Sequence, residues 1–186
     1  MNGPEGQAPV WSVELTAGSA AGTQALAARV GAALQAGDLL VLAGELGAGK
    51  TTFTQGLGEG LGVRPGIISP TFVLVRSHPS LRGGPDLVHV DAYRLGSPAE
   101  IDDIDLENSM DAAVTVVEWG RGRVEHLSDS WLDITLVRAT GEAAGAAGAG
   151  DAQPVIVPDF DAAEEDEPRL IRITAYGPRW QDRPLF

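Results

Sequence analysis

The first half of the chain has a pattern of apolar and polar positions that predicts alternating strands and helices. Residues 10–15 are typical of a short strand, and residues 19–35 are Ala-rich with apolar side chains repeating on one helical face. Residues 38–43 form a continuous apolar run, which is typical of a strand buried on both faces. A glycine-rich turn follows, and residues 51–61 again carry apolar side chains at helical spacing. This order predicts an α/β fold.

The second half of the chain adds short strands and one helix. We expect strands at residues 72–76, 87–91 and 114–117, a turn at residues 77–85 and a short acidic helix at residues 98–106. Residues 131–137 and 170–175 alternate apolar and polar side chains, which indicates an antiparallel pair with one face in water. The predicted architecture is a mixed, mainly parallel central sheet flanked by helices, with a C-terminal antiparallel strand pair.

Length and charge divide the chain into a leader, a core and an insertion. The 186 residues have the size of a single domain, which we place at residues 10–186 after a polar leader at residues 1–9. Residues 139–169 consist of an Ala/Gly tract followed by an acidic tract. Such a composition buries too little apolar surface to offset the entropy of ordering the chain. We therefore predict a flexible acidic insertion at about residues 139–169.

Composition excludes several classes of function. The chain has no cysteine, which excludes disulfides, thiolate metal sites and cysteine nucleophiles. Its three histidines are widely spaced, which argues against a zinc site. The formal net charge of −13 argues against unaided binding to a nucleic-acid backbone or an anionic membrane. We find neither a secretory signal nor a stretch near the roughly 18 apolar residues of a membrane span, and we expect a cytoplasmic protein.

The glycine-rich turn carries a phosphate-binding pattern. Residues 44–51 (GELGAGKT) match G-x-x-x-x-G-K-[ST] between a predicted strand and a predicted helix. The glycines allow backbone N–H groups to face inward, and the helix start adds a partial positive charge, so a polyphosphate is expected here. Lys50, the sole lysine, would reach the β- and γ-phosphates, and the Thr51 hydroxyl would complete a magnesium shell. The chain is thus predicted to be a P-loop NTPase whose loop contacts the nucleotide through Glu45, Leu46, Gly47, Ala48, Gly49, Lys50, Thr51 and Thr52.

Two carboxylates end apolar strands downstream of this loop. Asp91 closes the strand at residues 87–91, and Glu118 follows the strand at residues 114–117. Open α/β sheets bind ligands at the carboxyl ends of their strands, and Mg²⁺ prefers oxygen ligands. We therefore expect both acids to serve a magnesium nucleotide. His89 shares a strand face with Asp91, so it either orients Asp91 or is a packed core residue.

The nucleotide can be narrowed to ATP. Ras-like GTPases recognise guanine through an Asn-Lys-x-Asp loop, and the chain has no lysine after Lys50. It also has no LSGGQ-like signature, which argues against a transporter ATPase.

Four segments of the chain together resemble a known family. They are GELGAGKTT (44–52), SPTF (69–72), HVDAYRL (89–95) and VVEW (116–119). In this order and at these intervals they resemble the TsaE (YjeE) family of small bacterial ATPases over about residues 10–138. The resemblance implies a compact P-loop NTPase that serves N6-threonylcarbamoyladenosine (t6A) biosynthesis in tRNA.

The resemblance also implies roles for residues at matching positions. Thr51 and Glu118 would be the magnesium ligands, and residues 69–71 would form a switch-like loop that senses the γ-phosphate. The catalytic candidates are Lys50, Thr71 and Asp91, and Trp119 is expected beside the nucleotide. The implied cofactors are ATP and Mg²⁺. The implied partners are TsaB and TsaD, the threonylcarbamoyl transferase, with tRNA contacted only indirectly through that complex and with no membrane contact.

The expected activity is a weak ATPase that partner proteins stimulate. Two alternatives stay open: a P-loop small-molecule kinase that holds its acceptor with arginines, and a nucleotide-gated binding module with little hydrolysis. Any direct tRNA contact is expected only at a local arginine patch made of Arg121, Arg123 and Arg138.

Overall fold

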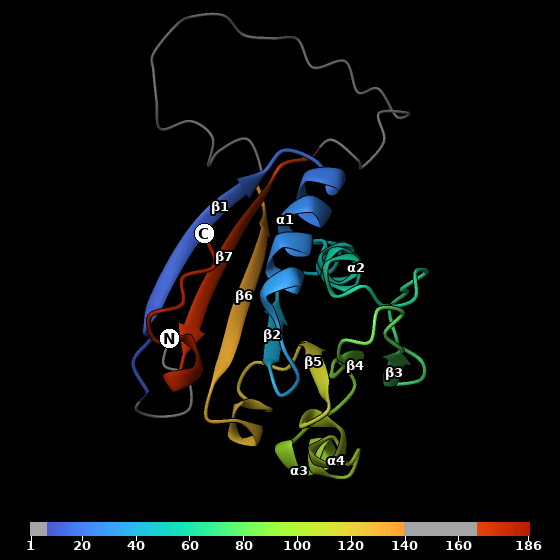
Figure 1. Ribbon diagram of the computed structural model, residues 1–186. Coiled ribbons are helices and arrows are strands. Elements are labelled where there is room, and N and C mark those ends of the chain that lie inside the picture. Colours follow the sequence, from blue (N-terminus) through green and yellow to red (C-terminus); the bar gives the residue numbers. More distant parts are fainter. Residues whose placement is uncertain (1–6, 140–166) are drawn as a thin grey trace, which may run out of the picture.

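Seven strands form one mixed sheet in the computed structural model, which describes residues 7–139 and 167–186 (Figure 1). The strands are β1 (Trp11–Ala17), β2 (Leu39–Ala43), β3 (Val75–His78), β4 (Asp86–Asp91), β5 (Ala113–Glu118), β6 (Trp131–Arg138) and β7 (Arg169–Tyr176). Their order across the sheet is β1-β7-β6-β2-β5-β4-β3. The four central strands β6, β2, β5 and β4 are parallel, and β3 at one edge and β7 and β1 at the other are antiparallel to their neighbours.

Helices cover both faces of the sheet. They are α1 (Ala20–Ala33), α2 (Lys50–Leu61), α3 (Pro98–Asp102) and α4 (Glu107–Met110), with 3-10 turns at Glu125–Leu127 and Pro178–Trp180. The α1–α2 pair packs on one face, where Phe53 and Leu57 join a buried cluster with Leu42. On the opposite face, Val41 joins a second cluster with residues of α3 and α4. None of the helices in the described part of the chain is both long and apolar enough to cross a membrane.

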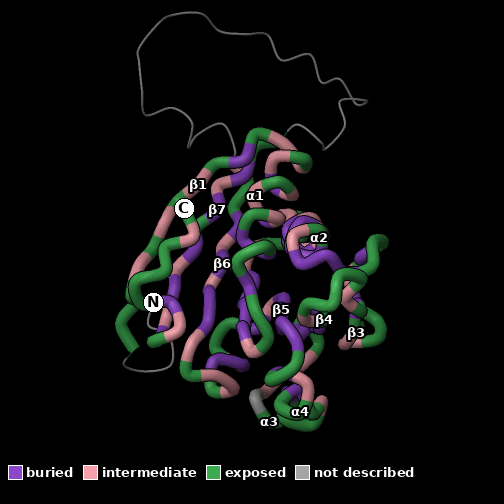
Figure 2. Tube along the Cα trace, in the orientation of Figure 1, coloured by how far each residue is buried: buried purple, intermediate pink, exposed green. Residues whose placement is uncertain are grey.

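Alternation along the strands decides which side chains lie under α2. Figure 2 shows that the inner strands and α2 are largely buried. Leu87 belongs to the cluster beneath α1 and α2, whereas Val88 and Val90 belong to the opposite cluster. Because successive side chains of a strand point to opposite faces, His89 and Asp91 share the face of Leu87. The site described below therefore lies on the α2 side of the sheet.

The α1–α2 contact depends on a close approach of two backbones. A Cβ atom built on Gly60 of α2 would lie 2.1 Å from the carbonyl oxygen of Ala28 in α1. No side chain fits in that space, so glycine allows the two helices to touch. The contact holds α2, and with it the loop that precedes α2, against the sheet.

The mixed α/β architecture is confirmed, with some corrections. The sheet is parallel only at its centre, and the C-terminal antiparallel pair, β6 and β7, is extended by β1. The predicted strand at 72–76 begins later, at Val75, because the backbone turns back on Pro70, whose carbonyl accepts from Val73 N and Leu74 N. Phe72 is consequently 85% exposed. The predicted helix at 98–106 ends early, at Asp102, because the chain turns at Asp105, which has a φ of 58°, and α4 begins only beyond the predicted range.

The predicted insertion falls almost wholly outside the described residues. Residues 140–166 of the insertion and residues 1–6 of the polar leader are not among them. At the boundary, Ala139 N donates to Pro168 O at 3.1 Å, and Arg169 is already part of β7. The described residues on the two sides of the insertion therefore lie next to each other.

Candidate functional site

The glycine-rich loop at residues 44–49 connects the end of β2 to the start of α2. Gly49 immediately precedes α2 with a φ of 101°, which only glycine adopts readily. Gly44 has a φ of 152°, and a Cβ atom there would lie 2.6 Å from Leu136 O of β6. The first backbone N–H groups of an α-helix have no partner within the helix. The loop therefore turns the N-terminus of α2 toward a cavity, where an anion could accept from these groups.

Lys50, the first residue of α2, folds back over this loop. Its Nζ donates to Gly44 O and Glu45 O, each at 2.8 Å, and lies 4.0 Å from the centre of the Trp119 ring. Burial lowers the pKa of the Lys50 ammonium below its usual value, and the carboxylates of Glu118 and Asp91 partly oppose this shift. Trp119 has a left-handed backbone with a φ of 61°, which directs its ring over the lysine. The ammonium is thus held beside the two acids and the cavity.

Glu118, at the end of β5, connects the loop to the sheet. Its Oε1 accepts a hydrogen bond from the Thr51 hydroxyl at 3.2 Å and lies 2.8 Å from His89 Nε2. Glu118 is 3% exposed, and His89 is fully buried. His89 is therefore a buried residue that contacts Glu118, and the alternative in which it orients Asp91 is wrong.

Asp91, at the end of β4, is held by the loop at residues 69–71. Its Oδ2 accepts from the Thr71 hydroxyl at 2.8 Å and from the Ser69 hydroxyl at 3.4 Å. Its Oδ1 accepts from Tyr93 N at 2.9 Å. Asp91 and Glu118 are partners in the parallel β4–β5 register, so the two acids meet at the same edge of the sheet, as predicted. A movement of the 69–71 loop would reorient Asp91 and leave Glu118 in place.

A cavity of about 650 Å³ joins these groups, a size that suits a small-molecule ligand. Of the predicted site residues, the ones that line the cavity are Leu46, Gly47, Gly49, Lys50, Thr51, Thr52, Thr71, Asp91, Glu118 and Trp119. Glu45 and Ala48 do not line it. The Glu45 carbonyl accepts from Lys50, and Ala48, which is 1% exposed, presents its carbonyl to an arginine described below.

Two arginines of the cavity wall were not predicted as site residues. Arg138, at the end of β6, donates to Gly47 O at 3.1 Å from Nη2, and Arg169, at the start of β7, donates to Ala48 O at 3.1 Å from Nε. The register pairs Arg138 with Arg169, so one strand pair supports the outer side of the glycine loop. The alternation of apolar and polar side chains predicts the pairing of β6 with β7, but no local pattern predicts that β6 lies beside β2.

The predicted arginine patch is largely engaged within the molecule. Arg121 forms an ion pair with Asp133 and also donates to the Thr135 hydroxyl. The Asp133 carboxylate raises the pKa of the Arg121 guanidinium through their hydrogen bond. Arg123 donates to Ala92 O at 2.7 Å. The patch is therefore built into the fold, and its third member, Arg138, belongs to the cavity wall.

Comparison with known proteins finds a matching family model and similar chains. The family model described as "Threonylcarbamoyl adenosine biosynthesis protein TsaE" matches residues 17–145. A protein of Streptomyces coelicolor named "tRNA threonylcarbamoyladenosine biosynthesis protein TsaE" is 49% identical over 156 residues, which cover 83% of this chain and 91% of that protein. A protein of the same name from Bacillus subtilis is 39% identical over 118 residues, or 63% of this chain and 72% of the relative.

A solved structure has a similar fold. The "Crystal structure of Bacillus subtilus YdiB" superimposes with a TM-score of 0.63 at 28% identity, over 92% of this chain and 90% of that one. The family match and the 49% identical relative each extend over the loop, the two acids and most of the sheet. The chain therefore belongs to the TsaE family, which takes part in threonylcarbamoyladenosine modification of tRNA.

Proposed function

We propose that this chain is a P-loop ATPase that binds Mg²⁺-ATP and supports the complex that makes N6-threonylcarbamoyladenosine in tRNA. The observation that carries the proposal is the convergence of Lys50, Thr51 and Glu118 at the N-terminus of α2, on the wall of one cavity. This arrangement suits a bound triphosphate because it combines backbone donors, one cation and hard oxygen ligands.

The residues around the glycine-rich loop would each make a different contribution to phosphate binding. Backbone N–H groups at the start of α2 would donate to the phosphates, and Lys50 would exchange its bonds to Gly44 O and Glu45 O for bonds to phosphate oxygens. Arg138 and Arg169 hold the outward carbonyls of the loop, so the loop keeps its shape when the phosphates arrive.

The oxygen donors fit a magnesium ion. The described residues contain no group of three or more His, Cys, Asp or Glu side chains that could hold a metal. Mg²⁺ in nucleotide sites takes few protein ligands and completes its shell with water and phosphate oxygens. Thr51 and Glu118 would hold it through their side-chain oxygens. The bound ion would neutralise charge on the phosphates.

Hydrolysis would depend on Asp91 and its hydroxyl partners. The Asp91 carboxylate lies on the cavity wall, where it would orient the attacking water and accept its proton. Thr71 and Ser69, whose hydroxyls bond to this carboxylate, would change the orientation of Asp91 when the γ-phosphate is present. Tyr93 and Trp119, whose rings contact edge to face at 5.1 Å, would shield the reaction from bulk water.

We propose that the ATPase acts in the cytoplasm with TsaB and TsaD and that TsaD performs the threonylcarbamoyl transfer. The turnover of the isolated chain is then slow, and the partners stimulate it. In this arrangement the chain contacts tRNA only through the complex.

The test is mass spectrometry of tRNA nucleosides from cells depleted of this protein and complemented with variants. Wild type should restore the modified nucleoside, and Lys50→Ala and Asp91→Ala should not. If the modification persists in depleted cells, the role in tRNA is wrong. If Asp91→Ala restores it as well as wild type does, hydrolysis through Asp91 is not required, and a nucleotide-gated binding module explains the data better.

A further inference from the structure

His89 is a fully buried histidine on the central strand β4, directly beneath the proposed nucleotide site. We infer that His89 is a positioning residue that fixes the orientation of the Glu118 carboxylate so that one oxygen stays available for magnesium. The inference rests on the proposed function, because it assigns Glu118 a role toward the ion.

The strand register brings the two side chains together. His89 pairs with Val116 on the parallel strand β5, and Glu118 lies two residues beyond Val116 on the same face. The imidazole therefore reaches diagonally to Glu118, and Nε2 lies 2.8 Å from Oε1. A carboxylate oxygen is an acceptor, so Nε2 carries the hydrogen of this bond.

Both contacts to the carboxylate converge on one oxygen. Oε1 receives the bond from His89 and a second bond from the Thr51 hydroxyl at 3.2 Å. No residue in the described ranges donates to Oε2, although Glu118 lines the cavity. Because two donors share Oε1, the carboxylate cannot rotate without breaking the buried bond to His89. Oε2 is thus the oxygen left for the ion or for a water bound to it.

The environment of His89 does not suit a histidine that serves packing alone. Its other ring nitrogen, Nδ1, is buried and has no hydrogen-bond partner in the part of the chain that the structure describes. Val116, its partner in the β4–β5 register, is apolar and buried. An apolar side chain here would avoid burying an unpaired nitrogen. The bond from Nε2 to Glu118 is the interaction that an apolar residue could not supply.

His89 does not support the second acid. Asp91 already accepts from Thr71, Ser69 and the backbone of Tyr93. The two carboxylates therefore have separate supports, one in a loop and one in the rigid centre of the sheet. We therefore expect a change at His89 to alter how ATP binding depends on Mg²⁺ and to leave the contacts between Asp91 and the 69–71 loop unchanged.

The test measures ATP binding by isothermal titration calorimetry in EDTA and across a series of Mg²⁺ concentrations. For His89→Ala we expect unchanged affinity in EDTA and a loss of about 10- to 100-fold in apparent Mg²⁺ affinity, the usual effect of removing a hydrogen-bond partner of a metal ligand. His89→Gln, whose amide nitrogen extends toward the place of Nε2, should recover most of the loss. His89→Asn, one methylene shorter, should not recover it.

The control is His126→Ala, because His126 pairs with Asp102 at the exposed surface, 3.0 Å from Nε2 to Oδ1. This variant should show wild-type Mg²⁺ dependence. A second measurement, nitrogen-15 NMR of the histidines of the wild-type protein without nucleotide, should show hydrogen on Nε2 of His89. Hydrogen on Nδ1 alone would overturn the inference, and so would wild-type Mg²⁺ dependence in His89→Ala. If wild-type protein binds no ATP, or binds it equally with and without Mg²⁺, the proposed function itself fails.

Discussion

Lys50 bonds to two carbonyls of its own loop and would have to exchange these bonds for its proposed role. Lys50 is 5% exposed, and its ammonium is bonded to the two carbonyls and covered by the Trp119 ring. A phosphate must compete with these contacts, so part of its attraction for the lysine is offset. Burial lowers the pKa of this ammonium, and a negatively charged ligand beside it would raise that pKa again.

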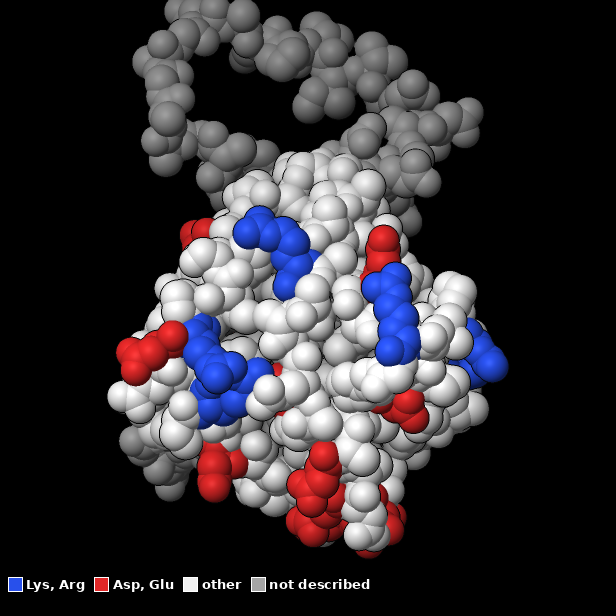
Figure 3. Space-filling view, viewed as in Figure 1, with Lys and Arg blue, Asp and Glu red and all other residues white. Residues whose placement is uncertain are grey.

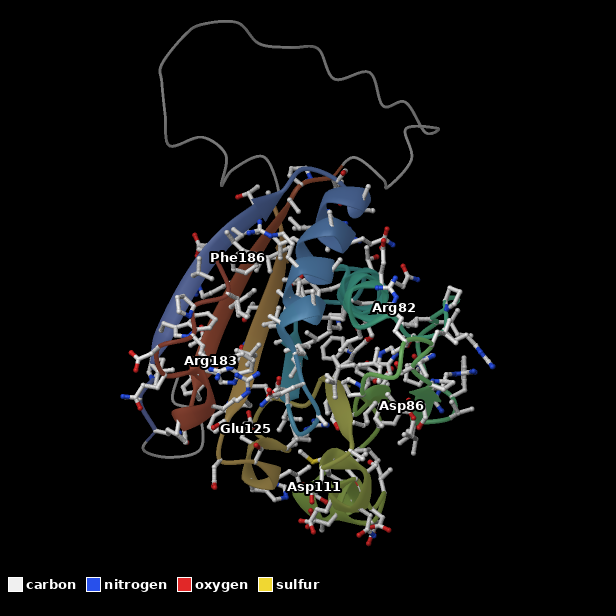
Figure 4. All side chains as sticks on the ribbon, viewed as in Figure 1. Arg82, Asp86, Asp111, Glu125, Arg183 and Phe186 are labelled. Atoms are coloured by element: carbon white, nitrogen blue, oxygen red, sulfur yellow. The ribbon has the colours of Figure 1, made fainter. Side chains whose placement is uncertain are left out.

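Replacing Lys50 by alanine should weaken ATP binding by about 10- to 100-fold, because a hydrogen bond to a charged group contributes roughly 1.5–3 kcal/mol. Isothermal titration calorimetry with ATP measures the change. Arg183→Ala is the matched control, since it also removes one positive charge but lies toward the β1–β7 side of the molecule, away from α2 (Figure 4). Unchanged ATP affinity in Lys50→Ala would refute the assignment of the loop.

Thr71 affects Asp91 through a single hydroxyl group. Thr71→Val keeps the shape of the side chain and removes the donor that lies 2.8 Å from Asp91 Oδ2. We expect ATP affinity within about 3-fold of wild type and hydrolysis slower by roughly 10-fold or more, because the carboxylate loses its orientation. Single-turnover kinetics separates the two effects. Thr71→Ser keeps the hydroxyl and should stay near wild type, and full turnover in Thr71→Val would contradict this role.

At the scale of elements, the site depends on how α2 is held against the sheet. The loop at residues 44–49 can present the N-terminus of α2 only if the helix is fixed, and α1 fixes it through backbone contact at Gly60. The outer side of the loop is held by Arg138 and Arg169 from β6 and β7. Elements that carry none of the predicted catalytic residues thus determine the geometry of the loop.

Gly60→Ala should destabilise the protein by about 1–3 kcal/mol, because its new methyl group would overlap the backbone of α1. Chemical denaturation measures the free energy of unfolding. The control is Gly22→Ala in α1, where the nearest atom to a new Cβ lies 3.5 Å away, and where alanine should be neutral or slightly stabilising. Equal stability of the two variants would show that the helices can separate without cost.

At the scale of the whole molecule, charge argues against direct tRNA binding. The chain carries a net charge of −13, and acidic side chains gather over α3 and α4 at one end of the visible face (Figure 3). Arg121 is already paired with Asp133. We expect the isolated chain to show no specific tRNA binding at about 0.15 M salt, measured by fluorescence anisotropy. Tight binding by the isolated protein would contradict indirect contact through the complex.

Residues 140–166 should be dispensable for nucleotide binding. The described residues on the two sides of this segment lie next to each other, because Ala139 N is bonded to Pro168 O at 3.1 Å. A short glycine linker can therefore replace the segment and leave Arg138 and Arg169 in place. ATP affinity of the deletion variant should stay within about 3-fold of wild type, as measured by calorimetry, and its unfolding should stay cooperative. An unfolded variant would show that the segment is structural.

Short-range patterns were sufficient to predict much of this protein. The loop motif lies within eight consecutive residues, and runs of mainly apolar residues mark β2, β4 and β5. Asp91 and Glu118 end their strands, and parallel strands place such residues at a common edge. These features depend on neighbours along the chain and on general rules of strand pairing, so the sequence by itself determined the loop, the strands and the two acids.

Only the tertiary structure decided which distant side chains meet. The partner of His89 is Glu118, the partner of Asp91 is Thr71, and Arg138 and Arg169 meet the glycine loop. Each contact depends on the order and register of strands across the sheet, which no local pattern encodes. Turn geometry at Pro70 likewise overrode the β-propensity of Phe72 and Val73. The residues that could react were therefore evident from the sequence, and the contacts that orient them followed from the packing of the sheet.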